Sequence, residues 1–216
     1  MTPQEYFNKF AGQYLRNKII LTSNDIKRAL DFAKEAAPKL IEREIYKHEN
    51  LDSLVKTLTN GGTTEIATGR FIGFDFFNSK IKKEGEEELC DLNDIGLQIG
   101  VKSVRMNNGL PLVYGSKNIK HPEIITVIGW RPEEVYIIGY ATIPMIEYYR
   151  SREFIWGDAK KNSKKCGYWG FHKLHEFKTF EDLKDLYSNK EINSYNNFTD
   201  TISEYFNESN FISKTK

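Results

Sequence analysis

The sequence predicts an α/β or α+β protein in which N-terminal helices precede a mixed central β-sheet flanked by helices. Three observations support this fold class. Apolar residues recur at helical spacing through the first 60 residues. From Thr63 onward, β-branched and aromatic residues gather in short runs that polar turns separate. A capping signal at Thr179 then marks a final helix.

The length of 216 residues suits one domain of ordinary size. We expect a helical segment over residues 1–60 packed on the core, an α/β core over residues 61–187, and a polar, partly disordered tail over residues 188–216. No run reaches the roughly 18 apolar residues of a membrane span, and two cysteines make no disulfide framework. We therefore expect an intracellular, cytoplasmic protein without membrane association. The net charge of +1 neither demands nor excludes a polyanionic partner.

Three helices are expected in the N-terminal segment. The first begins at a capping box at Thr2 and the second at Ser23. Pro38 should end or kink the second helix, because proline lacks the backbone N–H that a helix interior needs. The third covers residues 51–58 and should stop at Asn60-Gly61-Gly62.

Four strands are expected to follow, over residues 66–77, 97–104, 124–130 and 135–143. The run at residues 124–128 is almost entirely apolar, which predicts a strand covered on both faces. A turn over residues 131–134 joins the last two strands. The helix after Thr179 completes the core, and the chain from Ser188 is expected to be loose apart from a marginal helix near residues 202–206.

The segment at residues 86–105, EEELCDLNDIGLQIGVKSVR, is the part of the chain that most suggests chemistry. We expect a strand ending at residue 92, a turn over residues 93–96 and a second strand that completes a hairpin. Because strand side chains alternate between faces, Gln98, Gly100 and Lys102 should share one face, with Asp91 across from it. A lysine beside carboxylates can orient a water molecule, and carboxylates hold Mg²⁺, which polarises a phosphate.

These residues resemble the PD-(D/E)XK nuclease superfamily. Cys90-Asp91 stands where that family has Pro-Asp, and Gly100-Val101-Lys102 stands where it has acid-x-Lys. The resemblance covers roughly residues 65–187 and implies a restriction-endonuclease-like core. It also implies hydrolysis of DNA with Mg²⁺ or Mn²⁺, by an enzyme of restriction, homing or phage type. In that family scheme, Asp91 and the Val101 carbonyl hold the metal, and Lys102 positions the attacking water.

The motif departs from the family at Gly100, which has no side chain to offer a metal. Gln98 could supply an amide oxygen instead. A migrated carboxylate could come from elsewhere in the chain, the candidates being Glu65, Asp75, Glu87 and Asp94. We favour Glu65, because the family often contributes a Glu from an element that precedes the Asp strand. The alternative is a catalytically inactive relative that still binds nucleic acid.

Basic residues near the motif and in the segment from Arg150 to Lys173 are the candidate DNA contacts, because such groups can neutralise phosphates. They are Arg105, Lys160, Lys161, Lys164, Lys165 and Lys173. The aromatic residues between the lysines could stack on bases, although core packing is the favoured explanation for them. Cys166, His172 and His175 lack a fourth ligand at zinc spacing. In a further alternative, the protein binds a protein partner through Trp130, Tyr136 and Tyr140.

Overall fold

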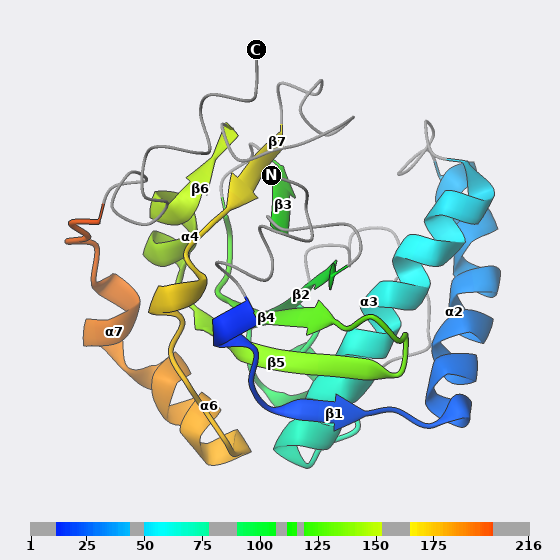
Figure 1. Ribbon diagram of the computed structural model, residues 1–216, viewed down its shortest axis with the longest axis horizontal. Coiled ribbons are helices and arrows are strands. Elements are labelled where there is room, and N and C mark those ends of the chain that lie inside the picture. The colour runs from blue at the N-terminus through cyan, green and yellow to red at the C-terminus, as the bar shows by residue number, and fades with distance from the viewer. Residues whose placement is uncertain are drawn as a thin grey trace.

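The computed structural model describes residues 12–43, 50–77, 90–106, 112–115, 119–152 and 165–200. In these residues the chain forms a mixed α/β fold with a four-stranded main sheet, a three-stranded second sheet and flanking helices (Figure 1). The α-helices are α2 (Ser23–Glu42), α3 (Leu51–Ile72), α4 (Ile143–Tyr149), α6 (Phe180–Ser188) and α7 (Lys190–Ser194). Three short 3₁₀ helices are η2 (Gly12–Tyr14), η3 (Asn93–Ile95) and η6 (Phe171–Lys173). The helix expected at Thr2 lies outside the described residues.

The main sheet has the strand order β1-β5-β4-β2. Its strands are β1 (Lys18–Ile20), β5 (Glu134–Ala141), β4 (Glu123–Ile128) and β2 (Gly100–Arg105). β2 pairs with β4 in parallel, whereas the other neighbours are antiparallel, so the sheet is mixed as expected. Every residue of β4 is buried, which confirms the prediction of a strand covered on both faces.

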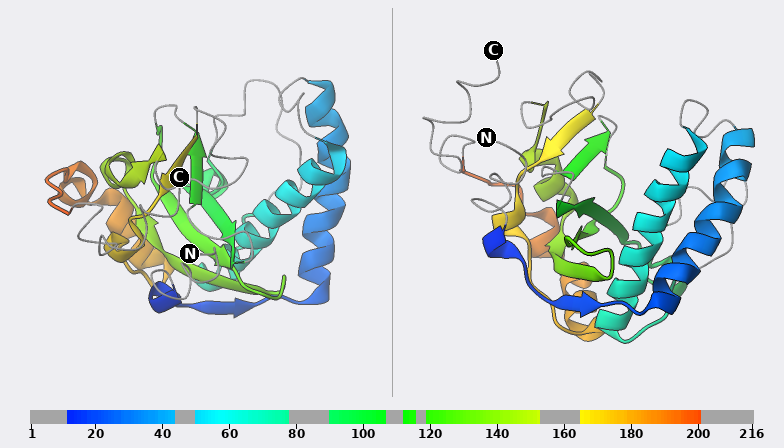
Figure 2. Two further views of the ribbon diagram at one scale, coloured as in Figure 1. Left: turned by 45° about the horizontal axis from the view of Figure 1, so that its top comes forward. Right: turned by 45° about the vertical axis from the view of Figure 1, so that its right-hand side comes forward.

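Alternate residues of β4 enter two apolar clusters on the two faces of the sheet. Ile124 and Ile128 pack with residues of α3, whereas Ile125 and Val127 pack with residues of α4 and the second sheet. The second sheet consists of β3 (Leu112–Gly115), β7 (Lys165–Tyr168) and β6 (Arg150–Ser151), in the order β3-β7-β6. Figure 2 shows α2 and α3 side by side, and α6 and α7 at the opposite end of the sheet. Among the described helices, none has the length and apolarity that crossing a membrane requires.

Helix α2 confirms the predicted second helix, and its proline does not end it. Thr22 caps the helix and Asp25 completes a capping box. Pro38 lies within the helix, which continues to Glu42. The alanine face of α2 is buried as far as Ala37, and this packing holds the helix through the proline.

Helix α3 overturns the predicted stop at Asn60 and the predicted strand over residues 66–77. It runs to Ile72 and crosses the expected boundary between residues 60 and 61. A Cβ on Gly62 would lie 3.1 Å from Cβ of Ala29, so this glycine permits close packing of α3 on α2. The β-branched Thr68 is buried, and its hydroxyl donates to the Thr64 carbonyl one turn earlier, which makes it compatible with a buried helix. The helix ends at Gly73, where φ is 81°.

The expectation of a loose chain after Ser188 is wrong as far as Asp200. α7 follows α6 almost at once, and Phe198 packs against the core. The helix expected near residues 202–206 lies outside the described part of the chain. The aromatic residues Tyr168, Trp169 and Phe171 are buried, which confirms the core explanation.

Two glycines of α3 form a matched pair for a stability test. A Cβ on Gly69 would lie 2.3 Å from the Phe74 carbonyl oxygen, whereas a Cβ on Gly61 would approach only Glu65 Oε1, at 4.0 Å. We expect Gly69→Ala to lower the free energy of unfolding by about 1–2 kcal/mol because backbone must move. Gly61→Ala should raise it by about 0.5–1 kcal/mol because alanine favours helix. Urea denaturation measures both, and equal effects would contradict the close contact at Gly69.

Candidate functional site at the start of β2

The segment before β2 folds as a compact loop, so the expected hairpin is wrong. Residues 90–92 form a turn, and η3 follows at once. The Leu92 amide donates to the Ile99 carbonyl at 3.1 Å, and Gly96 has a φ of 84°. Leu92 and Leu97 are both buried, and burying both leucines folds the segment back on itself. β2 therefore pairs with β4, a non-local partner, and not with the residues that precede it.

The loop nevertheless brings Asp91 to β2. Its Oδ2 accepts a hydrogen bond from the Val101 amide at 2.7 Å. Gly100 and Lys102 direct their backbone groups toward β4, since the Gly100 amide donates to Pro122 and the Lys102 carbonyl accepts from Thr126. The backbone N–H and C=O of Val101 therefore point to the outer edge of the sheet. Because the N–H and C=O of one strand residue point to the same side, the Val101 carbonyl is directed to the edge that Asp91 occupies.

The side chain of Lys102 projects from β2 on the face of the sheet opposite α3. Val101 packs into the cluster that contains α3, whereas Val104, which shares a face with Lys102, packs into the other cluster. Arg105, on the same face as Val101, confirms the assignment because its Nε donates to Asn60 of α3 at 2.8 Å. The Asp91 carboxylate thus lies at the edge of β2, beside the residue that precedes Lys102, and the Lys102 side chain lies on the face of the sheet toward α4 and the second sheet.

The other predicted ligands lie at different places. Gln98 is exposed before the strand begins, and its amide donates to Asn93. Glu65 lies on α3, and its Oε1 is directed back toward Gly61. Gly61 follows Asn60, which accepts the hydrogen bond from Arg105 at the end of β2. Asp75 pairs with Arg28, and Asp94 is exposed in η3. Glu87 lies outside the described residues.

The space beside Gly100 reveals two residues that sequence reasoning missed. A Cβ on Gly100 would lie 2.9 Å from His121 Cε1 and 3.6 Å from Glu123 Cγ. Glu123 begins β4 and is the register partner of Gly100. Its exposed fraction is 8%, so it is a buried carboxylate at the end of the sheet that holds Asp91. The only sequence signal was an acid at the start of an apolar strand, which is common on surfaces.

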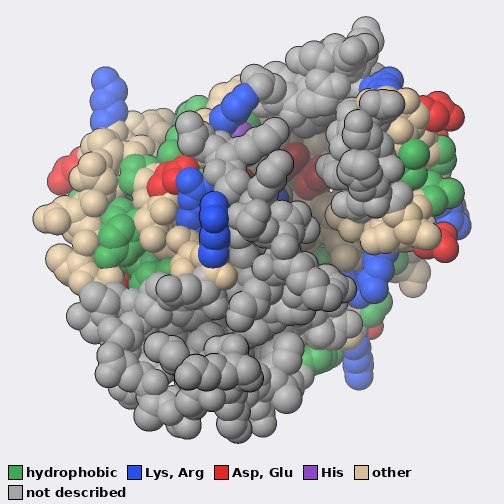
Figure 3. All heavy atoms as spheres, turned by 90° about the horizontal axis from the view of Figure 1, so that it is seen from above, with side chains coloured by type: hydrophobic (Ala, Val, Ile, Leu, Met, Phe, Trp, Pro, Cys, Tyr) green, Lys and Arg blue, Asp and Glu red, His purple; other side chains and the backbone are tan. Residues whose placement is uncertain are grey.

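The predicted DNA contacts do not form a continuous basic surface in the described part of the chain. Arg105 is half-buried against α3, and burial lowers the pKa of its guanidinium. Lys173 pairs with Asp200. Figure 3 shows Lys and Arg side chains at scattered points of one face, with acidic side chains among them. Of the remaining candidates, Lys165 is described for its backbone in β7 alone, and Lys160, Lys161 and Lys164 lie outside the described residues.

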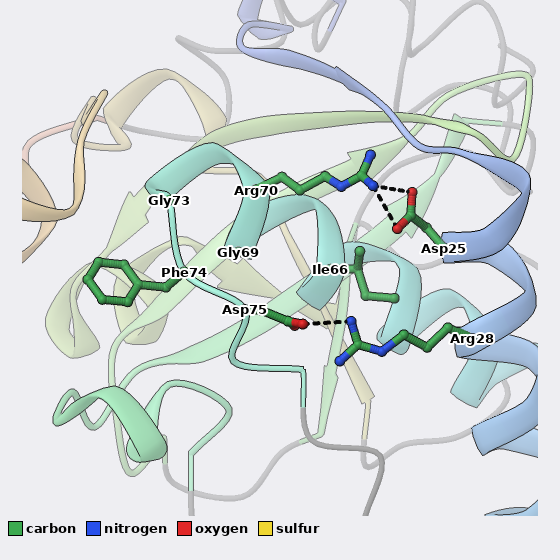
Figure 4. Close-up of a pocket in the computed structure, with 8 residues that line it drawn as sticks. All are labelled: Asp25, Arg28, Ile66, Gly69, Arg70, Gly73, Phe74 and Asp75. Carbon is green, nitrogen blue, oxygen red and sulfur yellow. Dashed lines mark hydrogen bonds and ion pairs between the residues drawn. The ribbon is translucent and has the colours of Figure 1, made fainter.

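A cavity of ≈ 290 Å³ between α2 and α3 is a separate feature from this site. Figure 4 shows Arg70 directed at Asp25 and Arg28 directed at Asp75, with ion-pair distances of 2.7 and 2.8 Å. Each guanidinium thus has a carboxylate partner. The charges in the cavity balance, so it offers no excess charge to a ligand.

A second polar cluster surrounds Asp200 at the end of the described chain. Asp200 Oδ2 accepts from Tyr149 at 2.9 Å, lies 2.8 Å from His172 Nε2, and lies 3.0 Å from Lys173 Nζ. Burial raises the pKa of Asp200, but hydrogen bonds from His172, Lys173 and Tyr149 outweigh it and lower that pKa to about 2. Burial lowers the pKa of His172, and Asp200 opposes that effect only in part. This cluster fastens residues 195–200 to the core.

Among the residues that the structure describes, no three His, Cys, Asp or Glu side chains are gathered closely enough to hold a metal ion together. Comparisons of the chain with protein-family models, curated proteins and solved structures found no match. What the site can do therefore follows from its own geometry. That geometry offers a carboxylate and a backbone carbonyl at one sheet edge, with a lysine on the adjoining residue.

Proposed function

We propose that this protein is a metal-dependent endonuclease that hydrolyses DNA phosphodiester bonds. The supporting observation is the hydrogen bond of 2.7 Å between Asp91 Oδ2 and the Val101 amide. It joins the aspartate to the residue that precedes Lys102. A PD-(D/E)XK nuclease needs an acid near a lysine, and the loop brings Asp91 to the residue next to Lys102.

The residues at this edge suit a magnesium ion. Mg²⁺ takes oxygen ligands and is commonly held by one or two carboxylates, with water and substrate oxygens completing its shell. Asp91 and the Val101 carbonyl would hold it, with Glu65 a further candidate from α3. The metal, or Mn²⁺ in its place, supplies positive charge that polarises the phosphate.

The chain's own groups account for the remaining steps. A carboxylate offers about four acceptor positions, so Asp91 can bond to the Val101 amide and still present oxygen to a metal. The ammonium of Lys102 donates to the attacking water and orients it toward the phosphorus. Gln98 and Arg105 are directed to Asn93 and Asn60, which leaves Asp91 and Lys102 as the residues that define the centre. A homodimer would supply the two centres that cutting a duplex requires.

Lys102→Ala tests the proposed activity directly. Supercoiled plasmid and single-stranded DNA are incubated with Mg²⁺ or Mn²⁺, and we expect the variant to cut about 100-fold more slowly or worse, because the water loses its orienting group. Lys34→Ala, an exposed lysine on α2, should cut like the wild type. Equal cutting by all three proteins would remove Lys102 from the mechanism and point to a contaminating nuclease.

Gly100 favours one second candidate function, a nucleic-acid-binding protein that has lost catalysis. Glycine offers no carboxylate at the position where the family has its second acid. In that case neither the wild type nor Lys102→Ala would cut DNA, but both would bind it with an affinity that falls as the salt concentration rises. Exposed apolar groups favour a protein partner less clearly. Trp130 is 50% exposed, but Tyr140, a second aromatic considered for such an interface, is fully buried.

A further inference from the structure

We propose that Tyr149, His172 and Lys173 form a binding site for a phosphate group, and that the Asp200 carboxylate occupies this site from within the chain. The ligand is a phosphate, either free or at the end of a nucleic acid, since both present the same oxygens to the site. The proposal does not depend on metal-dependent cleavage, because none of these residues belongs to the centre at β2. It assigns to residues 195–200 the role of an internal competitor for that ligand.

Three donors converge on one carboxylate oxygen. Asp200 Oδ2 accepts a hydrogen bond from the Tyr149 hydroxyl at 2.9 Å, and it lies 2.8 Å from His172 Nε2 and 3.0 Å from Lys173 Nζ. A terminal oxygen of a phosphate group is an acceptor of the same kind, and it takes charge-assisted hydrogen bonds from such donors. The three donors therefore suit a phosphate oxygen as well as they suit a carboxylate.

The core holds Tyr149 and His172 in place through contacts that do not involve Asp200. Tyr149 ends α4 and is fully buried, and its ring packs edge-on against Trp169 at a centroid distance of 4.8 Å. A Cβ on Gly170 would lie 2.6 Å from Tyr149 Cγ, so the chain before η6 packs directly on this ring. The His172 ring stacks on Trp169 and contacts the Tyr149 ring edge-on. These two donors therefore stay together when the carboxylate leaves, as a preformed site requires.

Asp200 reaches the site from a segment that no regular secondary structure holds. Residues 195–200 follow α7 and form neither helix nor strand. Phe198 attaches the segment through ring contacts with Tyr148 and Tyr149, at 4.9 and 5.3 Å, and the Tyr148 hydroxyl donates to the Asp200 carbonyl. Local opening of such a segment costs less free energy than unfolding the core that carries the donors. The segment can therefore release the site while the site stays folded.

The charges favour an anionic ligand once Asp200 has left. Lys173 is a cation, and among the described residues Asp200 is its ion-pair partner. Burial lowers the pKa of His172, so its imidazole is neutral near pH 7 and donates without adding charge. Burial also lowers the pKa of His175, which borders the neighbouring cavity. Without Asp200 the donors thus carry one positive charge, that of Lys173, and an ammonium is a common partner of phosphate.

A cavity beside the donors gives room for the rest of a ligand. Its volume is ≈ 160 Å³, and Met145, Lys173 and His175 line it from the core. Residues 195 and 197–200 form its other wall. Because Lys173 and Asp200 belong to both the cavity and the cluster of donors, the two spaces adjoin. An organic group attached to the phosphate would extend into this cavity, and departure of residues 195–200 would widen it.

Phosphate binding to Asp200→Ala tests the proposal. The affinity for inorganic phosphate is measured by titration calorimetry at pH 7 and constant ionic strength, without divalent metal. In the wild type, phosphate binds only the fraction of molecules in which Asp200 has left, so we expect Asp200→Ala to bind at least about 10-fold more tightly. Adding Lys173→Ala should abolish this gain. Asp185→Ala, which changes an exposed acid on α6, should bind as the wild type does.

A second variant keeps the test decisive if Asp200→Ala does not fold. Asp200→Asn keeps the size of the side chain and loses its charge. Millimolar phosphate should raise its melting temperature more than that of the wild type, with chloride at equal ionic strength as the reference. Equal rises in the two proteins would overturn the proposal, and so would equal phosphate affinities of the wild type and Asp200→Ala.

The source of the phosphate is identified with two oligonucleotides. A strand with a 5′-phosphate and the same strand with a 5′-hydroxyl are titrated into Asp200→Ala without metal, so that no cleavage occurs. Tighter binding of the phosphorylated strand than of inorganic phosphate supports the site and identifies a nucleic-acid end as the source. Equal binding of these two ligands supports the site with free phosphate as the source. Binding that is the same for both strands and persists after Lys173→Ala overturns the proposal, because another surface then binds the DNA.

Discussion

Asp91→Asn is expected to slow metal-dependent DNA cleavage by about 100- to 1,000-fold while the fold stays intact. The amide oxygen of asparagine can still accept the hydrogen bond that Asp91 Oδ2 accepts from the Val101 amide. The variant therefore removes the negative charge that would hold the metal and keeps the contact that holds the loop on β2. Single-turnover cleavage of a labelled duplex with Mg²⁺ measures the chemical step directly.

Asp91→Ala separates the structural role of this residue from the catalytic one. Alanine removes both the charge and the acceptor, so the Val101 amide loses its partner and the free energy of unfolding should fall by about 1–2 kcal/mol. Asp91→Asn should melt close to the wild type, and Asp185→Asn, an exposed acid on α6, should match the wild type in both assays. Full activity in Asp91→Asn would exclude Asp91 as the metal ligand.

Local signals in the sequence were sufficient where the structure depends on local contacts. The capping box of Thr179 and Asp182 begins α6 as predicted, because both partners lie within four residues. The contact of Asp91 with the Val101 amide joins residues ten positions apart, but a loop makes it in place of the expected hairpin. The expected position of Asp91 opposite Gln98, Gly100 and Lys102 stays a prediction.

Non-local packing decided the features that the sequence did not reveal. Gly62 resembles a helix stop, but its role is set by Ala29, which lies on another helix. The partner of β2 is β4, which lies beyond β3 in the chain. The register between these two strands is what places Glu123 beside Gly100, 23 positions earlier. A single sequence carries no direct record of register, so the acid nearest the defect in the motif could not be identified from it.

The Asp200 cluster makes the stability of this protein sensitive to acid, with a sign that the two pKa shifts determine. The pKa of Asp200 falls to about 2 in the folded chain, against about 3.9 when unfolded. Its contribution is therefore complete above about pH 4 and is lost as the pH falls toward 2. The pKa of half-buried His172 is also lowered, so the unfolded chain takes up its proton first and stability declines as the pH falls below about 6.5.

In Asp200→Asn, the decline of stability between about pH 4 and pH 2 should disappear, and residues 195–200 should be attached less firmly to the core. The variant leaves Lys173 without its carboxylate and weakens the bonds from Tyr149 and His172, so we expect a loss of about 2–3 kcal/mol at pH 7. Urea denaturation at pH 7, 4 and 3 measures the change, with Asp185→Asn as the exposed control. The loss relative to wild type should shrink between pH 4 and pH 3, because the wild-type carboxylate gives up its own contribution there. A loss that stays constant over this range would show that the three donors do not act through the charge of Asp200, and that other contacts such as the packing of Phe198 hold the segment.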